Sequence, residues 1–417
     1  MREAPVMRSI ANNRTPSVYR KLYENNAPRL PENYIAPSGV RDIRLHEIDL
    51  YVTMRCNIKC QFCSVRAGEY DHADLPLDRC LSLIDEAKDL GLEELHFLGG
   101  EPTLREDLGD MVAHAARLGI ETRIITNGLL LDSDDIRRLK DIGLVELMIS
   151  VDGMPDSHNF LRVSGKKGWH RTMRCVDDAI RAGIRTRVAT TAYDDNYDDV
   201  LTLLRHVNER GVQRYSVFLG SPLGRGHGMI RRVLDPYRWR SLQEAVAREL
   251  VVLRDDLSVI MEQGFAWSDG PPVDRSSLKG RGTGCNTLLE DFDYLIVRSD
   301  GNLYQCVFFM TEGKPIGNVR QQPLGRTLQY ALEKAEYKPF TTANDKCVSC
   351  FHQAECGTGC RGYAYLLGDD WLKTDPRCSK TEPSLTQPPP YYPLCPIMKW
   401  NARTGAFGGS SEQALKG

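Results

Sequence analysis

The spacing of the cysteines constrains this chain more than any other feature of its sequence. Thirteen cysteines occur in 417 residues, and ten of them fall into a few close groups. Those ten are Cys56, Cys60, Cys63, Cys285, Cys306, Cys347, Cys350, Cys356, Cys360 and Cys378. The N-terminus lacks the apolar core of a secretion signal, and in such a chain clustered cysteines indicate metal ligation or redox chemistry before structural disulfides. Cys80 and Cys175 lie in helical patterns and are predicted to be core thiols.

Between residue 46 and about residue 219, short apolar and β-branched runs alternate with helical stretches. The predicted strands are 48–53, 94–99, 122–126, 146–151, 185–191 and 214–220. The predicted helices are 77–91, 105–119, 133–143, 170–183 and 196–211, with a further helix at about 236–255. This alternation predicts an α/β fold with parallel strands and right-handed crossovers. We expect a partial (β/α)6 barrel, while a flat, doubly wound sheet is the alternative that periodicity leaves open.

Composition divides the chain into four segments. Residues 1–45 form an N-terminal extension, and 46–268 contain the predicted barrel and the helix that follows it. Residues 269–382 are predicted to be a small, cysteine-rich α+β domain, and 383–417 form a tail rich in Pro and Gly. The formal net charge is −2, so nothing points to a nucleic-acid partner, and no run of 18 apolar residues predicts a membrane span. We expect a cytoplasmic protein.

The first cysteine group follows the first predicted strand. Cys56, Cys60 and Cys63 form a C-x3-C-x2-C pattern. Three thiolates on one loop can bind three irons of a [4Fe–4S] cluster and leave the fourth iron open, whereas an electron-transfer cluster normally has four cysteines. A zinc site with a remote fourth ligand is the alternative.

This cysteine loop, with Phe62 before its third cysteine, resembles that of the radical S-adenosylmethionine (SAM) superfamily. Gly99-Gly100-Glu101-Pro102, after the second strand, resembles the GGEP motif of the same family, although alone it would be an ordinary turn between a strand and a helix. The resemblance implies that SAM binds the open iron and that GGEP binds its amino group. Reduction of the cluster would then cleave SAM into methionine and a 5′-deoxyadenosyl radical, which abstracts a hydrogen atom from the substrate.

Weaker matches follow the next strands. Thr126-Asn127-Gly128 and Ser150-Val151-Asp152-Gly153 occupy positions that face the cofactor in related enzymes, and Ser150 is a candidate contact for SAM. Arg162 occurs where relatives often have an arginine that binds a carboxylate. Turn chemistry or a surface charge is the alternative for each of these residues. Pro222–Gly226 resembles a loop common in SPASM-containing enzymes, and the sequence assigns it no role.

The C-terminal cysteines match the seven-cysteine pattern of SPASM domains. Cys285 and Cys306 bracket Gly301 with the spacing C-x15-G-x4-C, and C-x2-C-x5-C-x3-C with a last cysteine seventeen residues later completes the pattern. The resemblance implies two auxiliary [4Fe–4S] clusters, and so three clusters in all. The outer one would bind Cys347, Cys350, Cys356 and Cys378, and the inner one Cys285, Cys306 and Cys360. Cys395 either completes the inner cluster or is a plain thiol of the tail.

Two other features of this region bear on that pattern. A zinc-ribbon or rubredoxin-like site over residues 347–356 would leave Cys285, Cys306 and Cys378 unexplained. Asp300-Gly301 predicts a hairpin turn between two short strands.

Three classes of function compete. The leading one is oxidative modification or cross-linking of a ribosomally synthesised peptide, and the second is dehydrogenation or epimerisation of a sugar or aminocyclitol in natural-product biosynthesis. A non-catalytic electron carrier is disfavoured by the open iron and GGEP. A reductant such as flavodoxin or ferredoxin would supply electrons. Val307 follows Cys306 where sulfatase maturases have Asp, which argues against that subfamily. The candidates for a substrate base are Asp152, His158, Tyr193 and Asp194.

Overall fold

The computed structural model of the protein describes residues 43–70, 72–262, 292–333, 360–368, 398–401 and 406–409. Its strands are β1 (Leu45–Thr53), β2 (Glu94–Gly99), β3 (Glu121–Thr126), β4 (Glu146–Ser150), β5 (Arg185–Ala192), β6 (Arg214–Leu219), β7 (Ser258–Glu262), β8 (Phe292–Val297), β9 (Asn302–Tyr304), β10 (Gly317–Asn318), β11 (Met398–Asn401) and β12 (Ala406–Gly409). Its α-helices are α1 (Leu77–Asp89), α2 (Leu108–Arg117), α3 (Ser133–Asp141), α4 (Pro155–Arg162), α5 (Gly168–Ala182), α6 (Asp199–Arg210), α7 (Pro236–Glu249), α8 (Val307–Thr311), α9 (Leu324–Glu333) and α12 (Arg361–Gly368). Short 3-10 helices lie at η1 (Pro102–Leu104), η2 (Asp194–Asn196), η3 (Gly224–Arg232) and η4 (Leu250–Val252).

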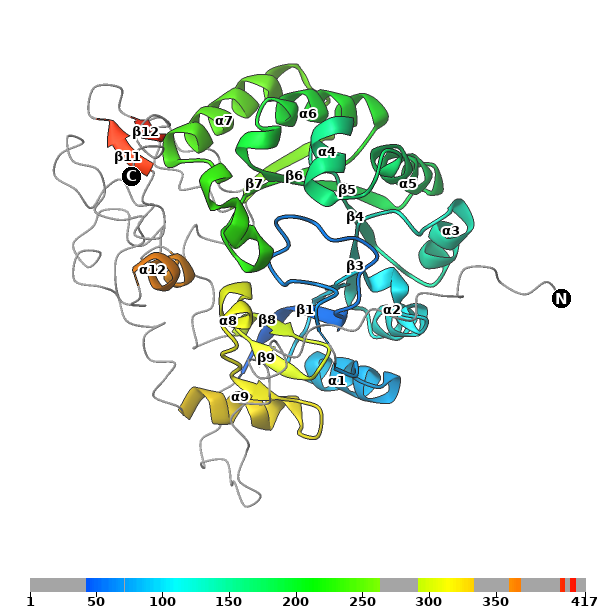
Figure 1. Cartoon of the computed structure of the whole chain (residues 1–417). Coiled ribbons are helices and arrows are strands. Elements are labelled where there is room, and N and C mark those ends of the chain that lie inside the picture. The colour runs from blue at the N-terminus through cyan, green and yellow to red at the C-terminus, as the bar shows by residue number, and fades with distance from the viewer. Residues whose placement is uncertain are drawn as a thin grey trace.

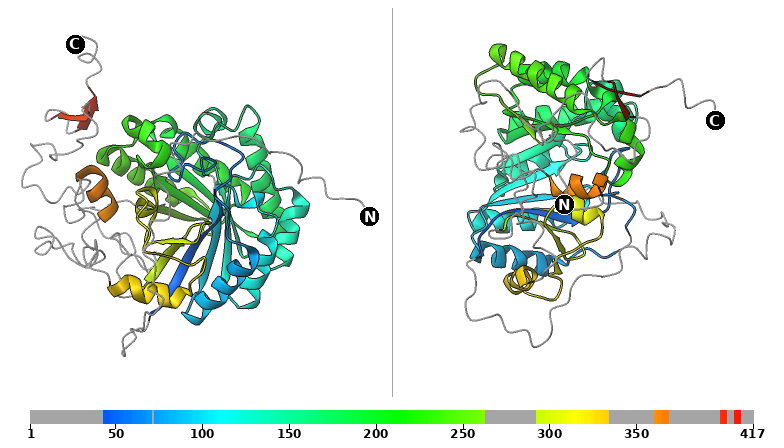
Figure 2. Two further views of the ribbon diagram at one scale, coloured as in Figure 1. Left: turned by 60° about the horizontal axis from the view of Figure 1, so that its bottom comes forward. Right: turned by 90° about the vertical axis from the view of Figure 1, so that its left-hand side faces the viewer.

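The order of the strands settles the choice between a barrel and a doubly wound sheet. Strands β1 to β7 are hydrogen-bonded in sequence order and all run parallel. Because each crossover leads to the next strand in the same direction, right-handed connections place the helices on one face. Figures 1 and 2 show α1 to α6 as an outer layer around a curved sheet. The expected partial barrel is therefore confirmed.

The sheet extends beyond the six predicted strands at both edges. Strand β7, which the sequence patterns did not predict, pairs with β6, and β8 pairs in parallel with β1. Strands β8 and β9 form an antiparallel hairpin around Asp300-Gly301, which confirms the predicted turn. The first strands of the cysteine-rich segment thus belong to the same sheet as the barrel. The predicted boundary at residue 268 lies outside the described residues and stays a prediction.

Alternation along the strands gives the sheet two different faces. The face toward the helices is an apolar core, and one residue from each of the six barrel strands shows it: Leu50, Phe97, Ile124, Leu147, Val188 and Val217, all 1% exposed or less. The opposite, concave face carries charged side chains near the N-terminal ends of the strands. The segments of the predicted site follow the C-terminal ends of the strands. The core thus fixes the barrel, and the strand ends fix the site.

Local sequence explains how the outer helices begin and pack. Asp132 accepts hydrogen bonds from the backbone N–H groups of Asp134 and Asp135, both at 2.9 Å, which starts α3 with a capping box. The short helix α4, absent from the predicted helices, begins with Pro155 in its first turn, where no N–H donor is needed. Both predicted core thiols, Cys80 and Cys175, are buried.

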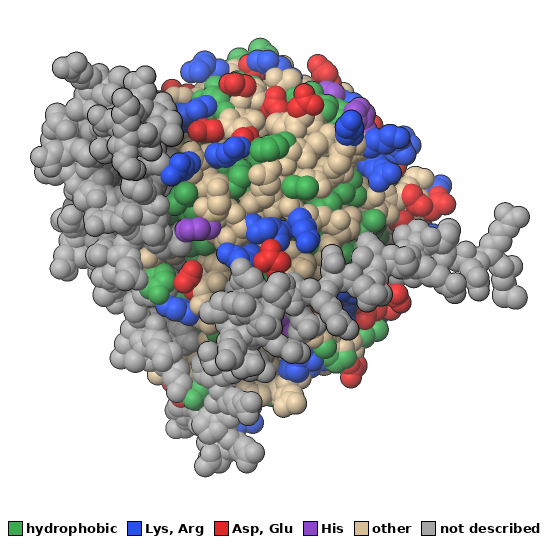
Figure 3. Space-filling model, in the orientation of Figure 1, with side chains coloured by type: hydrophobic (Ala, Val, Ile, Leu, Met, Phe, Trp, Pro, Cys, Tyr) green, Lys and Arg blue, Asp and Glu red, His purple; other side chains and the backbone are tan. Residues whose placement is uncertain are grey.

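Several predictions fall outside the described residues. Cys285, Cys347, Cys350, Cys356, Cys378 and Cys395 lie there, as does most of the N-terminal extension and of the C-terminal tail. Among the helices that are described, none combines the length and apolar character needed to cross a membrane. On the face drawn in Figure 3, basic and acidic side chains lie interspersed over the described part, as the near-zero net charge leads one to expect.

Candidate active site at the mouth of the barrel

The loop that links β1 to α1 carries the first three cysteines across the mouth of the barrel (Figure 1). Cys60 is buried, and Cys56 and Cys63 are partly exposed. The backbone N–H of Gly68 donates to Met54 O at 2.7 Å, which closes the loop on itself. The backbone N–H of Ala67 lies 3.4 Å from Cys63 Sγ. The fold thus collects the three thiols on one compact segment.

Burial keeps two of these thiols in the protonated form. It raises the pKa of Cys56 to about 11 and the pKa of Cys60 to about 12. A metal binds the thiolate and must displace the proton, so iron binding at this loop is coupled to proton release.

The GGEP segment is joined to the start of the cysteine loop through its backbone. The N–H of Gly100 donates to Thr53 O at 2.7 Å, and the N–H of Glu101 donates to Arg55 O at 2.8 Å. A Cβ atom on Gly100 would lie 2.0 Å from Arg55 O, so no larger residue fits without moving the backbone. The ends of β1 and β2 are therefore held together at the place where the sequence predicts SAM.

The carboxylate of Glu101 links the ends of β2 and β3. Its Oε1 accepts hydrogen bonds from Thr103 Oγ1 and Thr126 Oγ1, both at 2.7 Å, and its Oε2 accepts one from the backbone N–H of Asn127 at 2.8 Å. The side-chain Nδ2 of Asn127 in turn donates to Oδ1 of Asn57, the residue after Cys56, at 2.7 Å. Burial raises the pKa of Glu101, while these hydrogen bonds oppose that rise. A cation at this carboxylate would favour its ionised form.

The third element of the site is a buried ion pair after β4. Arg162, at the end of α4, donates to Asp152 Oδ2, and Asp152 Oδ1 accepts from the backbone N–H of Thr191 at 2.6 Å. The guanidinium carbon of Arg162 lies 5.6 Å from the ring centroid of Phe62, inside the cysteine loop. Arg162 is thus next to the cysteine loop, with Asp152 as its partner. Ser150 is the last residue of β4 and is half-buried.

Two of the candidate bases make structural contacts. Tyr193 Oη donates to Ser221 O at 3.1 Å, and its ring lies 5.6 Å from that of Phe62. Asp194 pairs with Arg238 at 2.9 Å. Asp152 is engaged by Arg162, so these three candidates all have side-chain partners or a hydrogen bond to the backbone.

The fourth candidate, His158, is fully buried and gives a prediction for stability against pH. Its Nδ1 accepts from the backbone N–H of Asp152 at 3.1 Å, and burial, aided by Arg162, lowers its pKa to about 3 from a usual 6.5. Because the unfolded chain binds this proton below pH 6.5 and the folded protein does not, stability falls as the pH falls through that window. We expect the His158 contribution to the free energy of unfolding to drop by about 0.8 kcal/mol from pH 8 to pH 6 and by about 2 kcal/mol by pH 5.

Urea unfolding of the protein, of His158→Asn and of the exposed control His170→Asn at these pH values measures that contribution. Asn keeps an acceptor but does not titrate, so His158→Asn loses less stability than the parent on acidification, while His170→Asn follows the parent. Equal pH slopes for the parent and His158→Asn contradict the prediction.

The described residues at the mouth fit a [4Fe–4S] cluster with bound SAM. Three thiols on one loop would supply three cysteine ligands, which is one fewer than an electron-transfer cluster normally has. The close backbone approach at Gly100 and the buried carboxylate of Glu101 lie at the end of β2, where the sequence predicts that SAM binds. The donor set therefore agrees with a cluster whose fourth iron binds a ligand other than protein.

Comparisons with known proteins identify the domain that carries these residues. Residues 50–207 match the family model described as the radical SAM superfamily. The chain is 26% identical over 344 residues to an AdoMet-dependent heme synthase from Nitratidesulfovibrio vulgaris, an alignment that covers 79% of this chain and 90% of that protein. It is also 26% identical over 336 residues to a PqqA peptide cyclase from Granulibacter bethesdensis, covering 79% of this chain and 85% of that protein.

Among solved structures, Streptococcus suis SuiB has a similar fold. Its structures bound to S-adenosylmethionine and to the precursor peptide SuiA both give a TM-score of 0.64, with 22% and 21% identity. They cover 77% and 80% of this chain and 75% of SuiB. Residues 50–207 of the chain are therefore a radical SAM domain. Enzymes of this superfamily use a [4Fe–4S] cluster and SAM.

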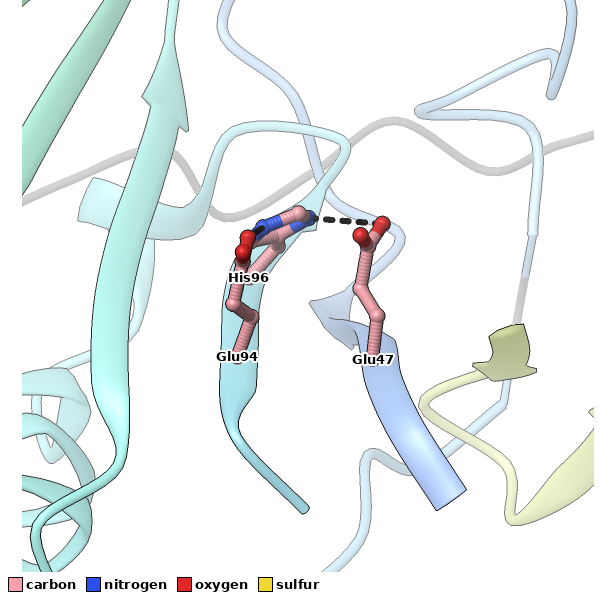
Figure 4. A group of neighbouring side chains, drawn as sticks. All are labelled: Glu47, Glu94 and His96. Atoms are coloured by element: carbon pink, nitrogen blue, oxygen red, sulfur yellow. Dashed lines mark hydrogen bonds and ion pairs between the residues drawn. The ribbon is translucent and has the colours of Figure 1, made fainter. Parts of the chain in front are cut away.

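A second polar group lies lower on the concave face of the barrel. The ligand atoms of Glu47, Glu94 and His96 lie within 4.8 Å of one another (Figure 4), a spacing that a cation could use. However, Arg123 Nη1 lies 2.8 Å from His96 Nε2, and Asp49 Oδ1 lies 2.9 Å from His96 Nδ1. The arginine places a fixed positive charge where the cation would bind, so we interpret this group as part of an ion-pair network.

Glu146 is the centre of that network. Its Oε1 lies 2.5 Å from Arg123 Nε and 2.9 Å from Arg187 Nε, and its Oε2 lies 2.8 Å from Arg214 Nη1. These residues come from β3 to β6, so the network joins four strands across the concave face. The sequence patterns above do not predict this network, although the alternation of charged and apolar residues in β2, β3 and β5 was the available signal.

Proposed function

We propose that this radical SAM enzyme has two auxiliary [4Fe–4S] clusters and oxidatively modifies or cross-links a ribosomally synthesised peptide. The observation that carries the proposal is the packing of two described cysteines of the C-terminal array. Cys306 and Cys360 both pack against a small apolar cluster made by Leu223, Phe308 and Tyr363. Leu223 follows β6 at the barrel mouth, so these two cysteines lie on the side of the predicted SAM site.

Each metal group has its own ligands in this proposal. Cys56, Cys60 and Cys63 bind the first cluster, which with SAM supplies the one-electron chemistry that forms a 5′-deoxyadenosyl radical. Gly99, Gly100, Glu101, Pro102, Ser150 and Arg162 position SAM. The inner auxiliary cluster takes Cys285, Cys306 and Cys360, with Cys395 as a further candidate ligand. The outer cluster takes Cys347, Cys350, Cys356 and Cys378. A flavodoxin or ferredoxin is the proposed reductant.

A peptide substrate is supported by what similar proteins bind. SuiB was crystallised with a precursor peptide, and a PqqA peptide cyclase aligns with most of this chain. The proposed auxiliary clusters fit an oxidative reaction, because removal of a hydrogen atom by the radical leaves a substrate radical with one further electron to lose. Transfer of that electron to a nearby cluster and of a proton to a base would make the net reaction a two-electron oxidation.

A tetrapyrrole substrate is the second candidate. Relatives described as AdoMet-dependent heme synthases and as an Fe-coproporphyrin III synthase, the latter from Methanosarcina barkeri, align with 78–79% of this chain at 25–26% identity. Among small-molecule substrates, a tetrapyrrole is therefore a stronger candidate than a sugar or aminocyclitol, because these alignments cover most of the chain.

The test compares the two substrate classes directly. The anaerobically reconstituted, reduced enzyme is incubated with SAM and either small peptides encoded beside its gene or iron-coproporphyrin III. We expect a peptide to lose two hydrogens in step with 5′-deoxyadenosine, both measured by mass spectrometry. If the mass of the tetrapyrrole changes instead, the substrate is a tetrapyrrole and not a peptide.

A matched pair of variants tests the auxiliary site. Cys306→Ala should still form 5′-deoxyadenosine but no oxidised product, because its electron acceptor is damaged. Cys175→Ala, at a buried core thiol, should keep both. Full product formation by Cys306→Ala would count against the auxiliary cluster.

A further inference from the structure

The segment Pro222–Gly226, which follows β6, has no role in the functions described above. It leads into η3 and turns back on itself, because the N–H of Gly226 donates to Leu223 O at 2.7 Å. Its residues contact two parts of the molecule that are far apart in sequence. One part is the first cysteine loop, and the other is the part of the C-terminal cysteine array around Cys306 and Cys360.

Arg225 binds the cysteine loop at several points. Its Nε donates to Cys60 O at 2.8 Å, and its Nη1 donates to Ala67 O at 3.0 Å and to Glu69 Oε1 at 2.7 Å. Its backbone N–H donates to Cys63 O at 2.9 Å. The side chain is 17% exposed. One guanidinium therefore spans the loop from its second cysteine to Glu69, which the branched donor geometry of arginine allows and a lysine ammonium cannot reproduce.

Gly224 allows this close approach. It has a φ of +56°, and a Cβ atom there would lie 2.2 Å from Ser64 O and 2.5 Å from Cys63 O. Arg66 Nη2 donates in return to Gly224 O at 3.3 Å. A side chain at position 224 would strain the backbone and push the two loops apart.

Leu223 makes the contact on the other side. It is 2% exposed and packs with Phe308 and Tyr363, whose ring centroids are 5.0 Å apart. Cys306 and Cys360 pack against the same three residues. Only one residue separates Leu223 from Arg225, so the two cysteine regions are connected through a very short stretch of chain.

We propose that Pro222–Gly226 is a clamp that fixes the radical-generating cluster relative to the auxiliary-cluster ligands, with Arg225 as the positioning residue. The proposal rests on the proposed binding of clusters by Cys56, Cys60 and Cys63 and by Cys306 and Cys360. Arg225 and Gly224 hold the carbonyl groups of the first loop, and Leu223 anchors the segment beside the second site. The distance between the radical source and the electron acceptor is set by this segment.

Two variants with matched controls test the clamp in the full-length, anaerobically reconstituted enzyme without substrate. Arg225→Lys keeps the charge but loses the branched donors, and its control is the exposed Arg231→Lys. Gly224→Ala introduces the clash, and its control is Gly228→Ala, where a Cβ atom meets nothing within 4 Å. Hydrogen exchange of the amides of residues 60–69 and the EPR spectrum of the reduced first cluster, with and without SAM, are the readouts.

We expect both clamp variants to speed exchange at Arg66 and Gly68 by at least about tenfold, as loss of hydrogen bonds to a charged group implies. Their first-cluster EPR signal should shift or broaden, while both controls match the parent. Leu223→Ala should instead alter the auxiliary signal. Parental exchange and spectra in both Arg225→Lys and Gly224→Ala would overturn the proposal.

The failure of this proposal can be told apart from failure of the proposed function. A parent enzyme that modifies no peptide leaves the exchange and EPR readouts of the clamp intact, because neither uses substrate. If replacing the first three cysteines left the iron content unchanged, the proposed binding of a cluster at that loop would itself be ruled out. Far-UV circular dichroism shows which variants are folded, and either folded clamp variant is sufficient for the test.

Discussion

Replacing Cys56, Cys60 and Cys63 together by alanine removes about four irons from the reconstituted protein and abolishes formation of 5′-deoxyadenosine. The three thiols lie on one loop between β1 and α1, so no single remaining ligand can hold the cluster there. Iron and sulfide assays measure the first effect, and mass spectrometry of SAM products measures the second. If all three clusters form, the parent binds about twelve irons and the triple variant about eight.

The matched control for this variant uses the two core thiols. Cys80→Ala and Cys175→Ala remove cysteines that are 0% and 1% exposed and pack in the main core. They should keep the iron content of the parent and its cleavage of SAM, with at most a modest loss of stability from the small cavity. Persistent cleavage of SAM by the triple variant would show that the radical is made elsewhere.

Changing Glu101 to Gln weakens the binding of SAM to the reconstituted enzyme by about 10-fold to 150-fold, which corresponds to about 1.5–3 kcal/mol for a hydrogen bond to a charged group. The carboxylate accepts from Thr103, Thr126 and Asn127 on its two oxygens. An amide has a single acceptor oxygen, so its NH2 group would face an N–H or O–H donor and the loops would shift. The variant also lacks the negative charge for the SAM ammonium group.

Equilibrium dialysis of SAM under anaerobic conditions gives the affinity, and iron content shows whether the cluster is retained. Glu106→Gln is the control, because Glu106 is exposed and lies five residues further along the chain. The same affinity in Glu101→Gln and the parent, with folding and iron unchanged, would exclude Glu101 from the SAM site.

Much of the scaffold was predictable because its signals are local. The six predicted strands agree with β1 to β6 to within about three residues, since β-branched runs and intervening amphipathic helices are read directly from neighbouring positions. Strand β7 and helix α4 were not predicted because each is short. In so short a segment the tertiary contacts, more than the local sequence, decide which secondary structure forms.

The site was predictable in composition but not in its contacts. The motifs that end β1, β2 and β4 indicated Cys56, Glu101 and Ser150 as site residues, because parallel strands bring their carboxyl ends to one edge. Arg162 was indicated only by resemblance. The partner of Arg162, the buried Asp152, could not be inferred, since only the packing of α4 onto β4 brings the two charges together. Nor could the contact between Arg225 and the carbonyl of Cys60 be inferred, because it joins residues 165 positions apart.

The sequence by itself determined the class of chemistry and the order of the elements. Thiol spacing decides which metal groups can bind, and periodicity decides which segments become strands or helices, and both are properties of short stretches of chain. Only the tertiary structure decided that the sheet curves with its helices on one face, that four strands share an ion-pair network around Glu146, and that Leu223 and Arg225 link two cysteine regions. Those features depend on contacts between segments that are distant in sequence. Such contacts form, and contribute to stability, only when the chain folds around its core.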